Sequence, residues 1–300
     1  MIVGGITMLF GGNPNAGQAI FGYGYVAGDT VSSLTNLVSN TGVVSSNVGG
    51  VGTARYAPAA TGYGGDKAIF GYGRHLPSGA PYSVSNLVSN TGVVASNVTG
   101  VGTARYSLAA ASYGTDKALF GYGESSVYVS ITNLVSNTGV VASDVVSPGT
   151  ARTKLAAAGY GTDKAIFGYG DPQTAITNLV SNTGVVSSNV TGVGSARGYI
   201  AAAGYGGDKA IFGYGSISGS STAVTNLVSN TGVVSSDVTG VGTARGGISA
   251  AGYGTDKAIF GFTQYASVTN LVSNTGVVSS NVAYVGTDRS ETAAASFGGV

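Results

Sequence analysis

One sequence unit repeats six times along this 300-residue chain. The block Asn-Leu-Val-Ser-Asn-Thr-Gly-Val-Val recurs at intervals of 50, 47, 45, 48 and 44 residues, and a second block, Ala-Ile/Leu-Phe-Gly-Tyr/Phe, precedes each copy. Self-similarity at such a period indicates a repeat architecture in which each unit is one supersecondary module. The first block begins at Asn36, Asn86, Asn133, Asn178, Asn226 and Asn270.

Each unit predicts four short strands. In one copy, a small apolar strand over residues 108–113 is followed by a turn rich in Gly and Asp at 114–117 and by a second strand over 117–122. The third strand, Val-Thr-Asn-Leu-Val-Ser, ends at Asn-Thr-Gly, a hairpin signal that tolerates positive φ. A fourth strand, Val-Val-Ala/Ser-Ser-Asn/Asp-Val, leads into the next unit. Because no stretch has helical periodicity, the chain is predicted to be all-β.

The length of the unit predicts a β-propeller. A period near ~45 residues with four strands per unit is typical of propeller blades. Crowding at the axis favours small side chains, and the first strand is rich in Ala, Gly and Ser in every copy. We predict a single domain, residues 1–300, that forms a six-bladed propeller with four antiparallel strands per blade. A β-solenoid is the alternative, although its coils are usually shorter and more uniform than these units.

Either end of the chain could supply the innermost strand of the N-terminal blade. Residues 293–298 are small and fit the innermost strand, whereas residues 7–10 are bulkier. We therefore predict that the C-terminal strand joins the N-terminal blade and closes the ring. Residues 1–12 are then an extra N-terminal arm. In the alternative, the two termini exchange these roles.

The units resemble the kelch repeat. Arg105 precedes an apolar strand, the run Leu119-Phe120-Gly121-Tyr122-Gly123 occupies the place of a strand that ends in a Gly doublet, and Thr132-Asn133-Leu134-Val135 occupies the third strand. Two features depart from the family: the doublet is Gly-Tyr-Gly, and Val replaces the outer-strand Trp. The resemblance covers nearly the whole chain and implies a propeller, but no particular activity, because kelch propellers have many functions.

The near-identical units and the low charge are also similar to kelch-like virion and appendage proteins of tailed bacteriophages. This resemblance implies a structural protein of a virion, attached to a tail or capsid, or an extracellular location. The implied partners are other structural proteins of an assembly and surface glycans. A cellular kelch adaptor is an alternative, and it implies an attached recruitment domain.

Composition excludes several classes of protein. Charged residues make up only 8% of the chain and the net charge is +1, so the basic footprint of a nucleic-acid binder is missing. There is no Cys and one His, His75, which leaves no thiolate metal site and no His pair. No apolar run reaches the ~18 residues of a spanning helix, and the N-terminus is a poor signal peptide. We expect no membrane insertion, metal or cofactor.

One arginine in every unit is predicted to be structural. A residue shared by all units is explained by what the units share, whereas an active site needs a unique constellation. We expect each arginine to satisfy carbonyl groups or to contact the neighbouring blade. The alternative is a ring of guanidinium groups that holds an anion at one mouth of the axial tunnel. These arginines are Arg55, Arg105, Arg152, Arg197, Arg245 and Arg289.

The copies differ mainly between their second and third strands. These loops cover residues 25–34, 74–84, 124–131, 171–176, 216–224 and 263–268. The short segments after each arginine vary too, and alternating strand directions place both sets on one face. Loops on a rigid scaffold are frequent recognition sites. The candidate partner-binding residues are Tyr25, Asp29, Arg74, His75, Tyr82, Glu124, Tyr128, Asp171, Gln173, Gln264 and Tyr265.

These features favour a non-enzymatic structural or binding propeller that presents its variable loops to a protein or glycan partner. No catalytic residue is predicted. The alternative is a carbohydrate-active enzyme built on a propeller. It needs two unrepeated carboxylates within ~5–10 Å of one another. Its candidates are Asp29, Glu124 and Asp171, gathered over the mouth of the tunnel.

Overall fold

The computed structural model describes residues 17–28, 30–263 and 266–298. In this part of the chain, every regular element is a β-strand, and the strands form six antiparallel sheets of three or four strands and two two-stranded hairpins. The all-β prediction is therefore confirmed. The predicted N-terminal arm, residues 1–12, lies outside the described residues.

The six sheets share one strand order. Their first strands are β24 (Ala293–Phe297), β5 (Ala59–Tyr63), β8 (Ala109–Tyr113), β12 (Ala156–Tyr160), β15 (Ala201–Tyr205) and β20 (Ser249–Tyr253). Their middle strands are β1 (Gln18–Gly22), β6 (Lys67–Gly71), β9 (Lys117–Gly121), β13 (Lys164–Gly168), β16 (Lys209–Gly213) and β21 (Lys257–Gly261). Their third strands are β4 (Thr35–Val38), β7 (Ser85–Val88), β10 (Ile131–Val135), β14 (Thr177–Val180), β19 (Thr225–Val228) and β22 (Val268–Val272).

The remaining strands are two residues long. Two sheets gain a fourth strand, β11 (Val145–Val146) or β23 (Val282–Ala283). Two loops between middle and third strands fold into hairpins, β2 (Tyr25–Val26) with β3 (Thr30–Val31) and β17 (Ser216–Ile217) with β18 (Ser220–Ser221).

The prediction of a regular fourth strand in every unit is wrong. In the first sheet, the four residues of β4 face the five residues 44–48, because Val38 pairs with Val44 and Thr35 with Val48. One extra residue makes this segment a β-bulge, which interrupts a regular ladder. The side chain of Asn36 fills the gap by donating hydrogen bonds to the Ser45 carbonyl (3.0 Å) and to Asn47 Oδ1 (3.1 Å). Strand propensity alone cannot reveal a bulge that depends on this side chain.

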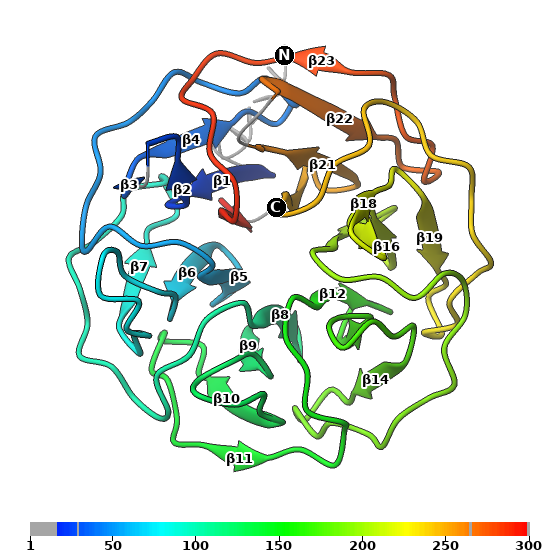
Figure 1. The fold of residues 1–300 in the computed structure, drawn as a ribbon, viewed down its shortest axis with the longest axis horizontal. Helices are drawn as coiled ribbons and strands as arrows, with labels where there is room; N and C mark the ends of the chain where they lie inside the picture. Colours follow the sequence, from blue (N-terminus) through cyan, green and yellow to red (C-terminus); the bar gives the residue numbers. More distant parts are fainter. Residues whose placement is uncertain (1–16, 29, 264–265, 299–300) are drawn as a thin grey trace, which may run out of the picture.

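The sheets lie around a common centre, with β5, β8 and β12 nearest the centre of the view and β7, β10 and β14 further out (Figure 1). Each first strand contacts the first strands of two other sheets, in the order β5, β8, β12, β15, β20, β24 and again β5. The small residues predicted for the axis make this approach possible. At Gly252, for example, an added Cβ would lie 3.3 Å from the carbonyl oxygen of Gly204 in the adjacent first strand.

A phenylalanine of each sheet packs on a glycine of its neighbour. The ring of Phe167 lies where a Cβ on Gly121 would be, at 2.6 Å, so any larger residue there would displace the ring. All six phenylalanines are fully buried. The six contacts again return to the first sheet: Gly22 with Phe70, Gly71 with Phe120, Gly121 with Phe167, Gly168 with Phe212, Gly213 with Phe260 and Gly261 with Phe21.

Backbone hydrogen bonds join the turns after the first strands in the same order. The amide of Gly114 donates to the carbonyl of Asp163 at 2.8 Å, and five equivalent bonds link the other neighbours. They run from Gly64 to Asp116, Gly161 to Asp208, Gly206 to Asp256, Gly254 to Gly17, and Gly298 to Asp66. Each sheet is therefore held to the next by main-chain as well as side-chain contacts.

The two ends of the described chain share one sheet. β24 pairs antiparallel with β1 from Gln18 opposite Phe297 to Gly22 opposite Ala293. This confirms the prediction that the C-terminal strand joins the N-terminal sheet as its first strand. The other five sheets each come from one continuous stretch of sequence.

The repeated arginines are buried between sheets. Arg152 donates to the carbonyls of Tyr169 (2.8 Å) and Thr150 (3.1 Å) and to Asn178 Oδ1 (2.8 Å), all in or leading into its own sheet. Its guanidinium lies 4.4 Å from the ring centroid of Tyr122, which follows the middle strand of the preceding sheet. The other five arginines stack in the same way on Tyr23, Tyr72, Tyr169, Tyr214 and Phe262.

These contacts agree with a structural role for the arginines. All six have at most 4% of their surface exposed, so they do not form an open anion-binding ring. Burial lowers the pKa of Arg152, an effect that the nearby Tyr122 partly offsets. The tyrosines of the Gly-Tyr-Gly runs are buried beneath the arginines, and the hydroxyl of Tyr72 donates to the carbonyl of Val101 at 3.1 Å.

Candidate functional site

The two sides of the molecule carry different connections. On one side, single β-bridges hold five of the six segments that follow an arginine against a loop after a middle strand, as between Thr153 and Asp171. On the other side, the turn after a first strand meets the turn after a third strand, as where Asn90 donates to Asp66. We call these the variable face and the constant face. The variable loops and the variable segments after the arginines therefore lie together, as predicted.

Six equivalent residues surround the axis on the variable face. They are joined by backbone hydrogen bonds, including Ser107 to Ala57 (3.0 Å), Lys154 to Ser107 (2.9 Å) and Glu291 to Gly247 (2.7 Å). All six have left-handed backbone angles, with φ between 49° and 67°. We call this set the axial ring: Ala57, Ser107, Lys154, Tyr199, Gly247 and Glu291. Its shared backbone carries six different side chains, so it distinguishes the otherwise similar sheets.

Charged and aromatic side chains gather around the axial ring. Lys154 Nζ lies 3.3 Å from Asp171 Oδ2 and 4.5 Å from the ring centroid of Tyr199. The guanidinium of Arg74 lies 4.5 Å from the centroid of Tyr106. Burial and the neighbouring Glu124 raise the pKa of Tyr106 to about 12. The Lys154–Tyr199 and Arg74–Tyr106 contacts cross from one sheet to the next, whereas Asp171 belongs to the same sheet as Lys154.

Glu291 is the acidic member of the axial ring. Burial raises the pKa of Glu291, and the positive charges of Lys154 and Arg74 offset only part of this effect. A carboxyl that is partly removed from water favours its neutral, proton-donating form.

A hollow opens beside Glu291. Its volume is about 370 Å³, and its lining includes Tyr199, Ser216, Gly246, Gly247 and Glu291. This unit has glycine at both positions after its arginine, Gly246 and Gly247, whereas each other unit carries at least one side chain there. Below it, a narrower axial well of about 120 Å³ is lined mainly by the first residues of the six first strands.

The predicted site residues divide between this cluster and the loops around it. Arg74, Glu124 and Asp171 lie at the junctions with the segments after the arginines. Tyr25 packs edge-on against Tyr56, with 5.9 Å between the ring centroids. These four surround the axial ring, although the sequence predicted only that they lie on the same face.

The other predicted residues lie further along the loops. His75 Nδ1 is 3.1 Å from Ser78 Oγ, and its ring centroid is 5.7 Å from that of Tyr82. Gln173 bridges to the adjacent hairpin through the backbone of Ser216 and Ser218. Tyr128 is exposed. Asp29, Gln264 and Tyr265 lie outside the described residues.

Sequence reasoning missed the members of the axial ring as site residues. Lys154, Tyr199 and Glu291 fall in the variable segments after the arginines, but only the longer loops contributed candidates. An alignment of the six units places the ring in a single column, Ala, Ser, Lys, Tyr, Gly and Glu, which is the signal that would have found it.

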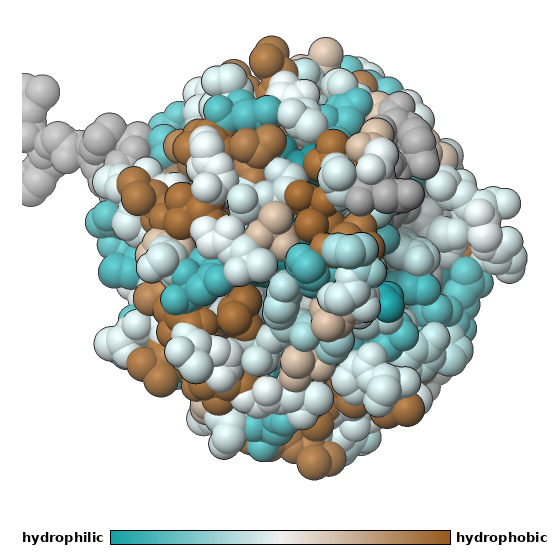
Figure 2. Space-filling view, turned by 60° about the vertical axis from the view of Figure 1, so that its left-hand side comes forward, coloured by the Kyte–Doolittle hydropathy of each residue, from teal (hydrophilic) through white to brown (hydrophobic). Residues whose placement is uncertain are grey.

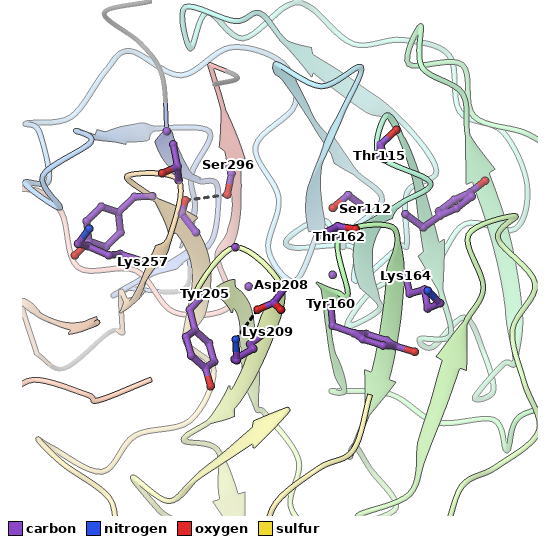
Figure 3. A pocket seen from close by; sticks show the side chains of 18 residues that line it. Ser112, Thr115, Tyr160, Thr162, Lys164, Tyr205, Asp208, Lys209, Lys257 and Ser296 are labelled. Carbon is purple, nitrogen blue, oxygen red and sulfur yellow. Dashed lines mark hydrogen bonds and ion pairs between the residues drawn. The ribbon is translucent and has the colours of Figure 1, made fainter. Parts of the chain in front are cut away.

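The constant face has a cavity of its own, about 290 Å³ in volume (Figure 3). In Figure 3, Lys209 turns toward Asp208 and Ser296 toward the backbone of β20. These contacts are 2.6 Å from Lys209 Nζ to Asp208 Oδ1 and 2.8 Å from Ser296 Oγ to the Gly252 carbonyl. The same Asp-Lys pair recurs in five of the turns, so this cavity has repeated rather than unique walls.

Across 17–28, 30–263 and 266–298, no three His, Cys, Asp or Glu side chains cluster so that they could hold a metal ion. Over the same ranges, no helix has the length and apolar character needed to cross a bilayer.

Comparison with known proteins assigns no family to the chain. No protein-family model matches the sequence, and no curated protein matches it.

The raised pKa of Glu291 predicts a pH-dependent stability difference. Below the pKa of the unfolded chain, Glu291 is neutral in both states, and its contribution to folding is fully present. As the pH rises through its folded pKa, the carboxyl ionises in a poorly solvated place and this contribution is lost. Glu291→Gln should therefore be more stable than wild type at pH 7 and equal to it near pH 4, measured by urea denaturation at both values.

Glu124→Gln controls for the loss of one negative charge from the same face. A Glu291→Gln variant with the same stability difference at both pH values would contradict the prediction, because only an ionising group can make that difference depend on pH.

Proposed function

We propose that the six sheets are the blades of a closed six-bladed β-propeller. The cycles of first-strand contacts, Phe-Gly contacts and turn hydrogen bonds support this, since each returns to the sheet where it began. A solenoid is disfavoured because every sheet is antiparallel and is built from about one unit. The shared sheet of β24 and β1 would then close the ring.

The propeller acts, in this proposal, as a non-enzymatic binding scaffold. The observation that carries it is the unrepeated cluster around the axial ring, since all six sheets otherwise share their side chains. Ser107, Lys154, Tyr199 and Glu291 lie at equivalent places on a common backbone, as in a scaffold that varies one surface. The partner is a glycan or a protein recognised at the variable face.

The setting that we propose is a virion or appendage, as the resemblance to kelch-like phage proteins implies. A weakly charged surface with exposed apolar side chains tends to associate. Exposed valines recur at the same outer position of every unit, with Val43, Val93 and Val140 each about two-thirds exposed. Figure 2 shows apolar patches dispersed among polar ones over the face in view. Such a surface suits a subunit surrounded by other structural proteins.

Glycan-array binding tests the role of the variable face. The loops 74–84 and 124–131 are each replaced by the six-residue loop 171–176, which leaves the hollow beside Glu291 intact. We expect glycan binding by the intact protein to fall at least tenfold in this variant, because the loop surface is removed while the sheets are unchanged.

The matched control changes the constant face. Thr115→Gly and Thr162→Gly introduce the residue that Gly65 and Gly207 already provide in equivalent turns, and they should leave binding unchanged. Equal binding by the loop variant, or no binding by the intact protein, would refute glycan recognition at the variable loops.

A glycoside hydrolase is a second candidate, favoured by the raised pKa of Glu291, since a general acid must hold its proton near neutral pH. The carboxylates predicted for such an enzyme have other partners: Asp171 pairs with Lys154, and Glu124 interacts with Tyr106. The test is whether the protein releases reducing sugars from glycans that bind on the array. Release by wild type that is abolished in Glu291→Gln would favour the enzyme over the binding scaffold.

A further inference from the structure

The hollow beside Glu291 lies where one unit has glycine at both positions after its arginine. The axial-ring position holds Lys154 in one sheet and Tyr199 in the next, but Gly247 in the sheet of β20. The preceding residue, Gly246, is also a glycine, and a Cβ there would approach the Cβ of Tyr199 at 3.3 Å. The space is therefore bordered by Tyr199 on one side and by Glu291 on the other.

The walls of the hollow are rich in hydroxyl groups. Ser216 and Ser221 come from the β17–β18 hairpin, Thr243 and Thr263 from the adjoining segments, and Ser290 precedes Glu291. Hydroxyls both donate and accept hydrogen bonds, so they match a ligand that presents several hydroxyls of its own. Neither a purely apolar ligand nor an inorganic cation needs such walls.

Tyr199 supplies the aromatic surface. It is 37% exposed and held at its position by the axial-ring backbone and by Lys154. An amphipathic ring of this kind offers an apolar face together with a polar tip. The C–H face of a sugar ring packs on such a surface while its hydroxyls reach the surrounding polar groups.

The charge of the hollow argues against an anionic ligand. Glu291 is its acidic group, and Arg245, the cation in its lining, is buried with 4% of its surface exposed. Two hydrogen bonds turn Arg245 inward, to the carbonyl of Thr243 and to Asn270. A phosphate or carboxylate would therefore meet a carboxyl group whose neighbouring cations, Lys154 and Arg74, already have partners in Asp171 and the Gly79 carbonyl. A neutral polyhydroxyl ligand can donate its hydroxyl protons to Glu291.

We propose that the hollow over Gly246 and Gly247 binds a neutral sugar unit, stacked on Tyr199 and hydrogen-bonded to Glu291. This inference rests on the glycan-binding function proposed above and gives it a specific subsite. The volume of about 370 Å³ lies at the lower end of the ~300–1,000 Å³ range of small-molecule pockets, which suits one or two sugar rings.

One substitution should fill the hollow without changing the backbone conformation, because another unit already carries the substituted residue at the equivalent position. Gly247 has φ +67°, which would strain most side chains, but Tyr199 adopts φ 54° at the equivalent place in another sheet. Gly247→Tyr should therefore fold like wild type and occupy the space with a ring. Ser107→Tyr makes the same change at a ring position that does not line this hollow, and it serves as the control.

Saturation-transfer NMR and calorimetry test the subsite with four probes: methyl α-glucoside, methyl β-galactoside, methyl α-mannoside and methyl N-acetyl-β-glucosaminide. At least one should bind wild type and Ser107→Tyr equally, and at least tenfold more weakly to Gly247→Tyr and Tyr199→Ala. Glu291→Gln, which keeps the shape of the side chain, should weaken binding less than the filled hollow does. Thermal unfolding of each variant verifies that it is folded.

The outcomes separate this subsite from the proposed function. The subsite is refuted if none of the four glycosides binds wild type, or if Gly247→Tyr binds as well as wild type. If the subsite is refuted but glycan-array binding still depends on loops 74–84 and 124–131, glycan recognition by the variable loops is supported without the subsite. If the loop variant binds the array like wild type but glycoside binding is lost in Gly247→Tyr, the subsite is supported and recognition by the variable loops is refuted.

Discussion

A chain that ends at Ser290 is expected to lose cooperative folding, because it lacks β24. Five residue pairs join β24 to β1, and the Phe297 side chain is only 3% exposed. Loss of one buried Phe side chain costs about 3–5 kcal/mol, and the buried alanines of the strand add to this. Natural domains are stable by only ~5–15 kcal/mol. Circular dichroism and size-exclusion chromatography should therefore show a largely unfolded or aggregated protein.

A circular permutant separates the effect of losing β24 from the effect of moving the end of the chain. Phe297 is joined to Gln18 through Gly-Thr-Asp, the turn that residues 114–116 make between β8 and β9, and the chain is reopened between Gly49 and Gly50. This permutant keeps the pairing of β24 with β1 in one continuous stretch and should melt cooperatively. A folded truncation, or a permutant that fails to fold, would contradict the closing role of β24.

Arg152→Met is expected to destabilise the protein by about 3 kcal/mol, which is large for a single substitution. The methionine fills much of the space but removes three hydrogen bonds. The carbonyl oxygens of Tyr169 and Thr150 and the side-chain oxygen Oδ1 of Asn178 each lose their donor. Each buried acceptor left unsatisfied costs about 1–3 kcal/mol. The contact with Tyr122 across the sheet boundary is lost as well. Urea denaturation measures the difference in the free energy of unfolding.

Two variants test the reason for that loss. Arg152→Lys keeps the charge but not the planar fork of donors, so it should recover only a part of the stability. Arg74→Met removes an arginine that is partly exposed on the variable face and should cost less than about 1 kcal/mol. An Arg152→Met protein as stable as Arg74→Met would contradict the structural role of the buried arginines.

Much of the architecture could be predicted from the repeated blocks. The Lys-Ala-Ile-Phe-Gly run predicted a middle strand, and β13 (Lys164–Gly168) is that strand, with Ala165, Ile166 and Phe167 fully buried. The small residues 293–298 predicted the place of β24 beside β1. The candidate site was predicted only in part, because Arg74, Glu124 and Asp171 were chosen for their variability while Glu291 and Tyr199 were not.

The sequence by itself determined the strand class, the places of three strands in each unit to within about one residue, and the face on which the units differ. These are local properties, set by side-chain periodicity, turn residues and alternating strand direction. Only the tertiary structure decided the rest. The bulge opposite β4 depends on Asn36 filling a gap, and the burial of Arg152 depends on a tyrosine of another sheet. Backbone hydrogen bonds through Gly247 hold Tyr199 and Glu291 on either side of the hollow. These three residues come from different units, so the hollow could not be predicted from the sequence of any one unit.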